Sequence, residues 1–131
     1  MTLFMLDTDT VSFALRGVGE AAVNVAKHAR SELCLSAITV AELRFGANKR
    51  QSRKIHQAID AFLSGVPVLD FDAAAASAFG KIAGTLSNAG APIGQMDTLI
   101  ASHALSVKAI LVTNNQKHYS KVPGLKLENW I

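Results

Sequence analysis

Short apolar segments alternate with stretches of helical pattern along this chain, and that alternation restricts the fold more than any other feature. Each apolar segment has the length of a short buried strand and is bounded by polar or turn residues. Clear segments lie at residues 3–6, 33–35, 66–69 and 109–112, and a last strand is expected around 125–128. We therefore predict an α/β fold, in which a central, mostly parallel sheet of about four to five short strands is flanked by helices.

The segments between the strands carry the start and stop signals of helices. Ser36 has the residue type of an N-cap, and Gly65 ends the amphipathic pattern that precedes it. Helices are expected at residues 8–15, 20–30, 36–47, 52–63 and 72–89, and from near Asp97 to residue 107. Residues 113–119 are polar and are predicted to form a loop.

Length and composition indicate one soluble globular domain. Half of the residues are hydrophobic, yet no apolar run approaches the roughly 20 residues that a membrane-spanning helix needs. The N-terminal sequence MTLFMLD lacks the basic region that begins a secretory signal. The single cysteine, Cys34, lies in the apolar sequence LCLSA, so we expect it in the core rather than as a nucleophile. These features are typical of a protein of the reducing cytosol.

The net charge of +3 is a weak indication of a polyanionic partner, and the distribution of the charges says more. Basic residues fall into two groups along the chain. The groups consist of Arg44, Lys49, Arg50, Arg53 and Lys54, and of Lys117, His118, Lys121 and Lys126. Either group can line a phosphate backbone, but a run of charges is also typical of a solvated surface, so both interpretations stay open.

The sequence MLDTDTV, residues 5–11, places two carboxylates directly after the first apolar segment. Asp9 is a candidate N-cap for a helix that begins near Thr10. Asp7 directly follows the strand, and open α/β sheets bind their ligands at the carboxyl ends of strands. Asp7 is therefore a candidate for a functional site.

Asp97 and Asn115 are expected at that same edge of the sheet. Asp97 begins a helix and shares its face with Ile100 and Ala104, so it points inward from the first turn. A carboxylate that faces a core is costly unless a cation or hydrogen-bond donors offset its charge. A bound cation and the free amides of the helix N-terminus are both able to do so, and the sequence alone leaves both open.

Glu42 is a further candidate, on the helix that follows Ser36. Thr39, Glu42 and Lys49 form a polar stripe on an otherwise apolar helix, which by itself favours a solvent-facing Glu42. Six residues beyond the cap correspond to roughly 9 Å along the helix axis. The helix must therefore cross toward the edge of the sheet if Glu42 is to reach the other two acids.

Three acids with the amide of Asn115 nearby form a set of hard oxygen ligands, which suits Mg²⁺ or Mn²⁺. Zinc fits poorly, because Cys34 is alone and the histidines show neither an HExxH pattern nor paired spacing. The histidines His28, His56, His103 and His118 are expected to be surface or capping residues. No phosphate-binding loop of the G-x-x-x-x-G-K-[ST] type is present.

A competing motif begins at Asp7. The D-x-D-x-[TV] pattern of haloacid-dehalogenase-type phosphatases matches residues 7–11, and residues 110–113 imitate the second motif of those enzymes. They need a lysine and an acidic pair downstream, whereas Glu128 is the sole acid after Thr113 in this chain. A receiver-like signalling domain fails in a similar way, because it needs its phospho-acceptor after a central strand. The order of the motifs excludes both classes.

Four longer stretches match a different family in order and spacing. They are LDTDTVSF at residues 6–13, SAITVAELRFGA at 36–47, PIGQMDTLIASHAL at 92–105 and ILVTNNQKHYSKVPGLKLENW at 110–130. With the C-terminal GL-x-x-ENW pattern, they resemble the PIN-domain ribonucleases, and most closely the VapC toxins of VapBC toxin–antitoxin modules. The resemblance extends over essentially the whole chain and implies one PIN domain, residues 1–131.

The resemblance implies roles for individual residues. Asp7, Glu42 and Asp97 correspond to the catalytic, metal-binding acids. Many members carry a fourth acid where this chain has Asn115, which weakens the case for a fully bound second metal. The expected supporting residues are Asn115, Thr113, Asn114 and Asp9. The residues expected to contact RNA are Arg44, Lys49, Arg50, Lys117 and His118.

The function that the resemblance implies is cleavage of RNA by a Mg²⁺-dependent toxin, with Mn²⁺ able to replace Mg²⁺. Similar toxins cut tRNA in the anticodon region, so we expect tRNA as the substrate and inhibited translation as the result. A VapB-type antitoxin is the expected partner. We expect the toxin to form a homodimer and a hetero-oligomer with the antitoxin in the cytoplasm, without association with a membrane. The alternative is a non-catalytic RNA-binding protein of the same fold that blocks translation by occupancy, for which Asn115 is the best support.

Overall fold

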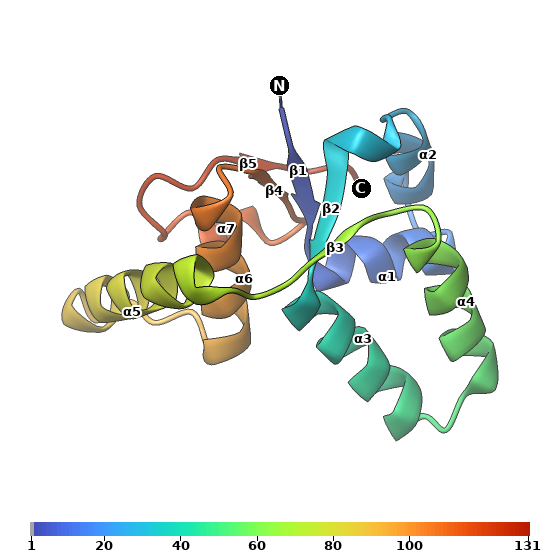
Figure 1. Cartoon of the computed structure of the whole chain (residues 1–131), viewed down its shortest axis with the longest axis horizontal. Helices are drawn as coiled ribbons and strands as arrows, with labels where there is room; N and C mark the ends of the chain where they lie inside the picture. The colour runs from blue at the N-terminus through green and yellow to red at the C-terminus, as the bar shows by residue number, and fades with distance from the viewer. Residues whose placement is uncertain (1) are drawn as a thin grey trace.

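Within residues 2–131, the part of the chain that this computed structural model describes, five parallel strands form one sheet with helices against both faces (Figure 1). The strands are β1 (Phe4–Leu6), β2 (Leu33–Ser36), β3 (Val68–Leu69), β4 (Ile110–Val112) and β5 (Leu127–Glu128). Their order is β3-β2-β1-β4-β5, and every neighbouring pair is parallel. The predicted α/β fold with a parallel sheet of short strands is confirmed.

Most helices begin and end close to the predicted residues. They are α1 (Thr8–Arg16), α2 (Ala21–Ala26), a 3₁₀ helix (Arg30–Glu32), α3 (Ala37–Lys49), α4 (Arg53–Leu63), α5 (Ala73–Asn88), α6 (Gln95–Ser106) and α7 (Gln116–Tyr119). Ser36 caps α3, as predicted, by accepting a hydrogen bond from the Ile38 amide at 3.1 Å. None of the helices described for residues 2–131 combines the length and the apolar character needed to cross a membrane.

The helix predicted at residues 20–30 is shorter than expected and ends at Ala26. The backbone is extended at Ala29, where the amide donates a hydrogen bond to the Glu32 carboxylate at 2.8 Å. That contact starts a separate 3₁₀ turn, so the helical pattern of the sequence is divided between two elements.

The polar stretch at residues 113–119, predicted as a loop, contains α7 instead. The Thr113 hydroxyl accepts a hydrogen bond from the Asn115 amide at 2.9 Å and so sets up the turn into the helix. The Asn115 carbonyl then accepts hydrogen bonds from the amides of His118 and Tyr119, both at 3.2 Å. The prediction is wrong because these short-range contacts outweigh the polar composition.

The sheet separates two apolar cores. Met5, Cys34 and Leu111 belong to the core formed with α5 and α6, whereas Leu6 and Leu35 belong to the core formed with α1, α3 and α4. This division follows the two-residue period of extended strands, and Figure 1 shows the two groups of helices on opposite sides of the strands. Cys34 is 1% exposed, and burial raises its thiol pKa to about 12, so its predicted place in the core is confirmed.

Two polar residues expected near the surface lie in the interior. His103 on α6 is 1% exposed, and its Nδ1 lies 2.7 Å from the Ser36 hydroxyl. The prediction of a surface or capping position is wrong for His103, because the cap of α3 gives the imidazole a buried partner. Burial lowers the pKa of His103, which favours the neutral ring. Thr39 is also fully buried, so it is not part of an exposed polar stripe on α3.

The connectivity creates a crevice between β1 and β4 at the carboxyl ends of the strands. The chain moves from β1 outward to β2 and β3, and then returns to β4 and β5 on the other side of β1. Open α/β sheets bind ligands at the point where the strand order reverses in this way. The Asp7 amide donates a hydrogen bond to the Val112 carbonyl at 3.0 Å, so the ends of β1 and β4 are joined there.

Candidate metal centre

Asp7 lies at the junction of β1 and α1, where its side chain is tied to the backbone. It is the N-cap of α1, and its Oδ1 accepts a hydrogen bond from the Thr10 amide at 2.8 Å. The residue is 3% exposed. Burial raises the pKa of Asp7 to about 6, and hydrogen bonds from Thr113 and Thr10 oppose this only in part. The fold therefore holds a carboxylate whose charged form gains from a nearby cation.

Asp9 lies in the first turn of α1, and its side chain is exposed. The candidate role of Asp9 as an N-cap is wrong, because the helix begins at Thr8 and the extended backbone that a cap needs falls at Asp7. Burial is the main cause of the raised pKa of Asp7 and of Glu42, and the charge of Asp9 adds to both. Asp9 thus increases the negative potential around the other acids.

Glu42 reaches the same crevice from α3. Its carboxylate accepts a hydrogen bond from the Thr8 hydroxyl at 2.5 Å, which joins α3 to the first residue of α1. The side chain is half-buried, so the solvent-facing position that the polar stripe favours is wrong. Burial raises the pKa of Glu42, the Thr8 hydrogen bond lowers it, and the charge of Asp97 raises it. Sequence reasoning missed Thr8, whose side-chain direction depends on how α1 and α3 pack.

Asp97 lies on the first turn of α6, and its side chain is 36% exposed. Its Oδ2 lies 3.0 Å from Nε2 of His118 on α7. Tyr119, the next residue on α7, is 2% exposed and also faces the acids. Burial raises the pKa of Tyr119, and the negative charges of the three acids raise it further, so its phenol is neutral. Sequence reasoning missed Tyr119 because it lay in a segment predicted as a loop.

The residues that follow β4 shape the other wall of the crevice. Thr113 is fully buried, and its amide donates a hydrogen bond to the Glu128 carbonyl of β5 at 2.8 Å. Asn114 is exposed, and its Oδ1 accepts a hydrogen bond from Asn129 at 3.0 Å. The exposed side chain of Asn115 makes no capping hydrogen bond to α7, which leaves its amide group available to a ligand.

A cavity of about 70 Å³ lies among these groups. It is lined by Asp7, Thr8, Asp9, Glu42, Asp97, Asn115 and Tyr119. Within residues 2–131, no three Asp, Glu, His or Cys side chains already converge on one point as metal ligands, because each acid faces a donor of its own. Mg²⁺ usually keeps several waters and takes one or two carboxylates, so this all-oxygen set fits such an ion.

Comparison with known proteins identifies the family. The PIN domain matches residues 4–125 of the chain. The chain belongs to the PIN-domain family. It is 38% identical over 131 residues to the tRNA(fMet)-specific endonuclease VapC of Shigella flexneri, with 99% of each chain covered. It is 37% identical over 132 residues to the ribonuclease VapC2 of Haemophilus influenzae (strain ATCC 51907), with both chains covered completely.

Solved structures agree with these sequence matches. The DNA-bound VapBC complex of Salmonella typhimurium contains a chain that matches this PIN domain with a TM-score of 0.90 and 36% identity, covering 100% of both chains. VapBC2 of Rickettsia felis, bound to a DNA fragment from its promoter, matches with a TM-score of 0.88 and 35% identity, covering 99% of this chain and 100% of the other. The predicted membership of the VapC group of PIN domains is confirmed.

A larger groove of about 670 Å³ adjoins the acidic cavity of this PIN domain, between α1, α3 and α4. The groove and the cavity share Thr8, Asp9 and Glu42. The apolar lining residues are Leu15, Leu43, Ala47, Ile55, Ala58 and Ile59, and the basic ones are Arg16, Arg50 and Lys54. Asp9 and Glu42 therefore line both the acidic cavity and a groove that is apolar inside and positively charged in part.

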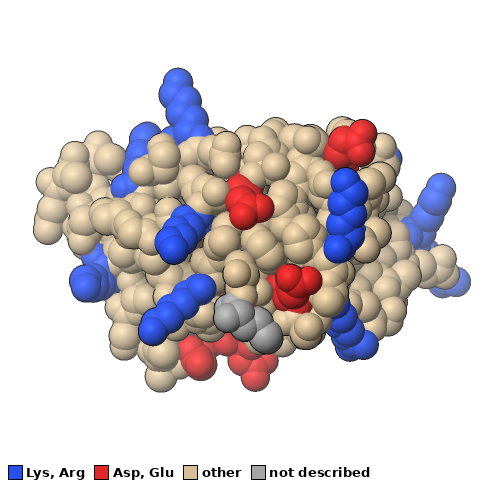
Figure 2. Space-filling view, turned by 90° about the horizontal axis from the view of Figure 1, so that it is seen from above, with Lys and Arg blue, Asp and Glu red and all other residues tan. Residues whose placement is uncertain are grey.

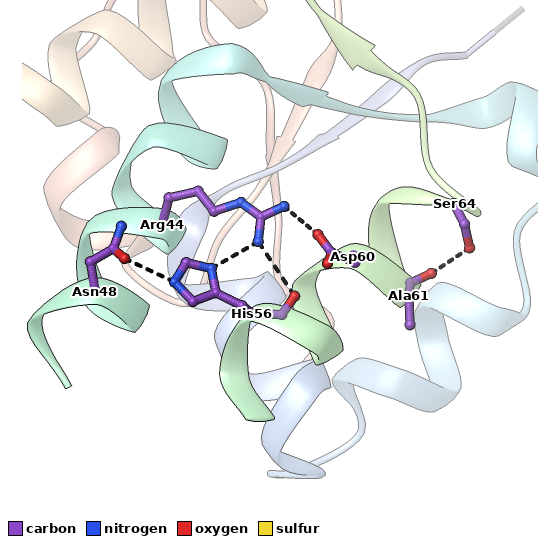
Figure 3. Close-up of polar contacts among 6 residues, drawn as sticks. All are labelled: Arg44, Asn48, His56, Asp60, Ala61 and Ser64. Carbon is purple, nitrogen blue, oxygen red and sulfur yellow. Dashed lines mark hydrogen bonds and ion pairs between the residues drawn. The ribbon is translucent and has the colours of Figure 1, made fainter. Parts of the chain in front are cut away.

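Arg44, one of the predicted RNA contacts, is engaged between α3 and α4 (Figure 3). Its guanidinium contacts the Asp60 carboxylate and donates a hydrogen bond to Nδ1 of His56 at 3.0 Å. Nε2 of His56 in turn lies 3.0 Å from Oδ1 of Asn48. Arg44 therefore fastens two helices that line the groove, which leaves its charge less available to RNA.

The other predicted RNA contacts differ in their surroundings. Lys49, Arg50 and Lys117 are exposed, and Arg50 lines the groove. His118 lies against Asp97 instead of being free on the surface. Figure 2 shows the face of the molecule on which β1 and β2 begin. Lysine and arginine side chains are dispersed among acidic ones on this face. Among the predicted RNA contacts, His118 therefore lies directly beside an acid, and Arg50 lines the groove that adjoins the acidic cavity.

Proposed function

We propose that this PIN domain, residues 1–131, is an endoribonuclease that requires Mg²⁺, and that Mn²⁺ can replace Mg²⁺. The metal-binding residues in this proposal are Asp7, Glu42 and Asp97. The observation that carries it is the single cavity at the switch point of the sheet, which all three carboxylates line. The names of the relatives, endonuclease and ribonuclease, support hydrolysis of RNA.

The chemistry divides between the ion and the chain. A bound divalent ion would supply an acidified water for attack on the phosphodiester and positive charge to offset the charge that grows on the phosphate. Asp7 from the end of β1, Glu42 from α3 and Asp97 from α6 would hold the ion, and Asn115 would offer a neutral oxygen. With a pKa of about 6, Asp7 is mostly ionised at neutral pH.

Transfer RNA, cut in the anticodon region, is the proposed substrate, and the proposed consequence is inhibition of translation in the cytoplasm. The relative from Shigella flexneri is named as specific for tRNA(fMet), which supports a tRNA substrate. Single-stranded loops such as the anticodon loop present unstacked bases and an accessible backbone. Exposed Lys49, Arg50 and Lys117 are the side chains that we propose to contact that backbone.

A VapB-type antitoxin is the proposed partner, and the groove between α1, α3 and α4 is its proposed binding surface. The apolar lining suits a peptide segment, and the groove ends at Asp9 and Glu42, where a basic side chain of the partner can replace the metal. The related structures are VapBC complexes, which supports such an assembly. Mg²⁺ and antitoxin should therefore compete, and equal metal binding by the free toxin and the complex would refute this form of inhibition. We further propose that the toxin forms a homodimer.

Cleavage of a tRNA pool with and without metal tests the proposed activity. We expect discrete fragments, with ends in the anticodon loop, when Mg²⁺ is present, no fragments in EDTA, and recovery when Mg²⁺ is restored. Asp97→Asn is the matched control and should give no fragments. Equal cleavage in EDTA, or by Asp97→Asn, contradicts the proposal. Binding of tRNA without cleavage in Mg²⁺ favours the alternative, a non-catalytic RNA-binding inhibitor of translation.

A further inference from the structure

One nitrogen of His118 contacts two segments that determine where Asp97 lies. Nε2 is 2.6 Å from the carbonyl oxygen of Ile93 and 3.0 Å from Oδ2 of Asp97. A carbonyl accepts hydrogen bonds but cannot donate them, so Nε2 must carry the hydrogen, which it donates to Ile93, while the Asp97 carboxylate lies beside the same nitrogen. His118 therefore acts on Asp97 directly and on the chain that leads to it.

The contact with Ile93 fixes the entry to α6. Ile93 is 4% exposed and packs in the core that includes α5 and α6. The next residue, Gly94, is the N-cap of α6 and has φ of 92°, a conformation that favours glycine and turns the chain sharply. Asp97 follows three residues later, so a hydrogen bond at Ile93 limits how this end of α6 moves relative to α7.

His118 is itself anchored to the opposite side of the acidic cavity. Its amide donates a hydrogen bond to the Asn115 carbonyl at 3.2 Å, and the Asn115 amide donates one to the Thr113 hydroxyl at 2.9 Å. Val112, the residue before Thr113, accepts a hydrogen bond from the Asp7 amide at 3.0 Å. A continuous series of contacts thus connects Asp7, at the end of β1, to Asp97, on α6.

We propose that His118 is a positioning residue that holds the Asp97 carboxylate toward the cavity for metal binding. The inference rests on the proposed metal-dependent function and gives His118 a role other than the RNA contact expected from the sequence. Carboxylates that bind metals depend on hydrogen-bond partners outside the coordination sphere, and loss of such a partner typically weakens metal binding about 10- to 100-fold.

The alternative role of His118 is competition with the metal for Oδ2. The geometry favours positioning, because Nε2 donates its hydrogen to the nearer Ile93 carbonyl, and this bond holds the imidazole in place beside Asp97. A carboxylate has a second oxygen, and Asp97 can bind metal through Oδ1 while Oδ2 keeps its contact with His118. The two roles predict opposite effects when the imidazole is removed.

Calorimetric titration of the free protein with Mn²⁺ separates these roles, using wild type, His118→Ala, His118→Gln and Gln116→Ala. Gln116 is exposed on the same short helix and serves as the matched control. We expect His118→Ala to bind Mn²⁺ about 10- to 100-fold more weakly. His118→Gln should remain close to wild type, because its amide N–H replaces Nε2–H, and Gln116→Ala should be unchanged.

RNA cleavage as a function of Mg²⁺ concentration provides the second measurement. We expect His118→Ala to need more Mg²⁺ and to approach the wild-type rate when Mg²⁺ is saturating. Unchanged or tighter Mn²⁺ binding by His118→Ala overturns the positioning role, and so does failure of His118→Gln to restore binding in a folded protein. If wild type binds Mn²⁺ and cleaves RNA while His118→Ala matches it, only this inference fails. If wild type binds no Mn²⁺, the proposed function fails, and the inference fails with it.

Discussion

Asp7 and Asp97 face the same cavity, but they are held there by different parts of the fold. Asp7 is 3% exposed and is fixed by backbone, as the N-cap of α1 and through the hydrogen bond from its amide to β4. The Asp97 side chain is 36% exposed, and its partner is another side chain, His118. The comparison teaches that one carboxylate is part of the framework of the fold, whereas the other depends on contacts that substitution can remove separately.

The burial of Asp7 also affects the stability of the metal-free protein. Burial raises the pKa of Asp7 from 3.8 to about 6, so the folded protein binds this proton more tightly than the unfolded chain. The stability that Asp7 contributes in its protonated form is present below pH 4 and is lost as the pH rises through 6. The ionised carboxylate of Asp7 therefore makes the metal-free fold less stable at neutral pH than its protonated form would, and a bound cation would offset that cost.

The largest expected effect is on cleavage and should be shared by both sides of the site. Asp7→Asn and Asp97→Asn should each lower the rate of RNA cleavage by more than about 100-fold, because each removes a charge from the ion, and even outer partners of metal ligands cost about 10- to 100-fold. Asp9→Asn changes the same type of group two residues from Asp7 and should cause a much smaller loss. Single-turnover cleavage rates provide the test. Wild-type activity of the Asp97→Asn variant would show that Asp97 does not belong to the site.

The next largest expected effect is a gain in protein stability when the buried charge of Asp7 is removed. In EDTA at pH 7, Asp7→Asn should raise the free energy of unfolding by up to about 3 kcal/mol, since a pKa shift of roughly two units is worth about 1.4 kcal/mol per unit. Asn is as good an N-cap as Asp, so the cap is kept. At pH 4 the difference from wild type should nearly vanish, because Asp7 is then protonated in the folded wild type.

Urea unfolding of wild type and variants at both pH values measures this difference, and comparison at equal pH cancels the titration of other groups. Asp7→Ala is the matched control and should be about 1 kcal/mol less stable than Asp7→Asn, because alanine cannot cap α1. A variant Asp7→Asn that is less stable than wild type at pH 7 would show that burial of this charge is not costly.

Much of this site could be predicted because it depends on strand ends. Asp7 follows β1 and Asn115 lies just beyond β4, and the carboxyl ends of parallel strands meet at one edge whatever the details of packing. Contacts between elements could not be predicted. The Thr8–Glu42 and His118–Asp97 pairs depend on how α3 crosses α1 and on the short helix α7, which a polar sequence concealed.

The fold shows the same division. Ser36 could be predicted as a cap because capping is decided within four residues of chain. The burial of His103 could not, because its partner is the hydroxyl of Ser36, 67 residues away in the sequence. Local rules thus locate the helices and strands, and the polar pairs between them require the tertiary structure.

Asn115, at the N-terminus of α7, provides a further test of the site, because it lines the same cavity as the two acids. Asn115→Asp adds a carboxylate to the cavity and should lower the Mg²⁺ concentration needed for half-maximal cleavage by roughly three- to tenfold, because added ligand charge tightens binding of a divalent ion. Asn115→Leu has no ligand oxygen and should lose much of the activity. Mg²⁺ titrations of cleavage measure both effects. An Asn115→Leu variant with the wild-type rate and Mg²⁺ requirement would show that the Asn115 side chain has no role in metal binding.

The smallest expected effect distinguishes an arginine in an ion pair from an exposed arginine. Arg44 is paired with Asp60, whereas Arg50 is exposed along the groove (Figure 3). Arg50→Ala should weaken RNA binding and reduce the slope of log affinity against log salt by about 0.7, the value for one contact with a single strand. Arg44→Ala should leave that slope unchanged and lower the free energy of unfolding by no more than about 1 kcal/mol. An equal change of slope in both variants would contradict the distinction.

The proposal that Asp7 after β1, Glu42 within α3 and Asp97 in the first turn of α6 share one divalent ion is tested most directly by locating the ion. Crystals of the free protein grown with Mn²⁺ would show its position through anomalous scattering. We predict one strong peak in the cavity among Asp7, Glu42 and Asp97, and its loss in Asp97→Asn. The absence of a peak there at millimolar Mn²⁺, or a peak at another position that Asp97→Asn leaves unchanged, would contradict the account.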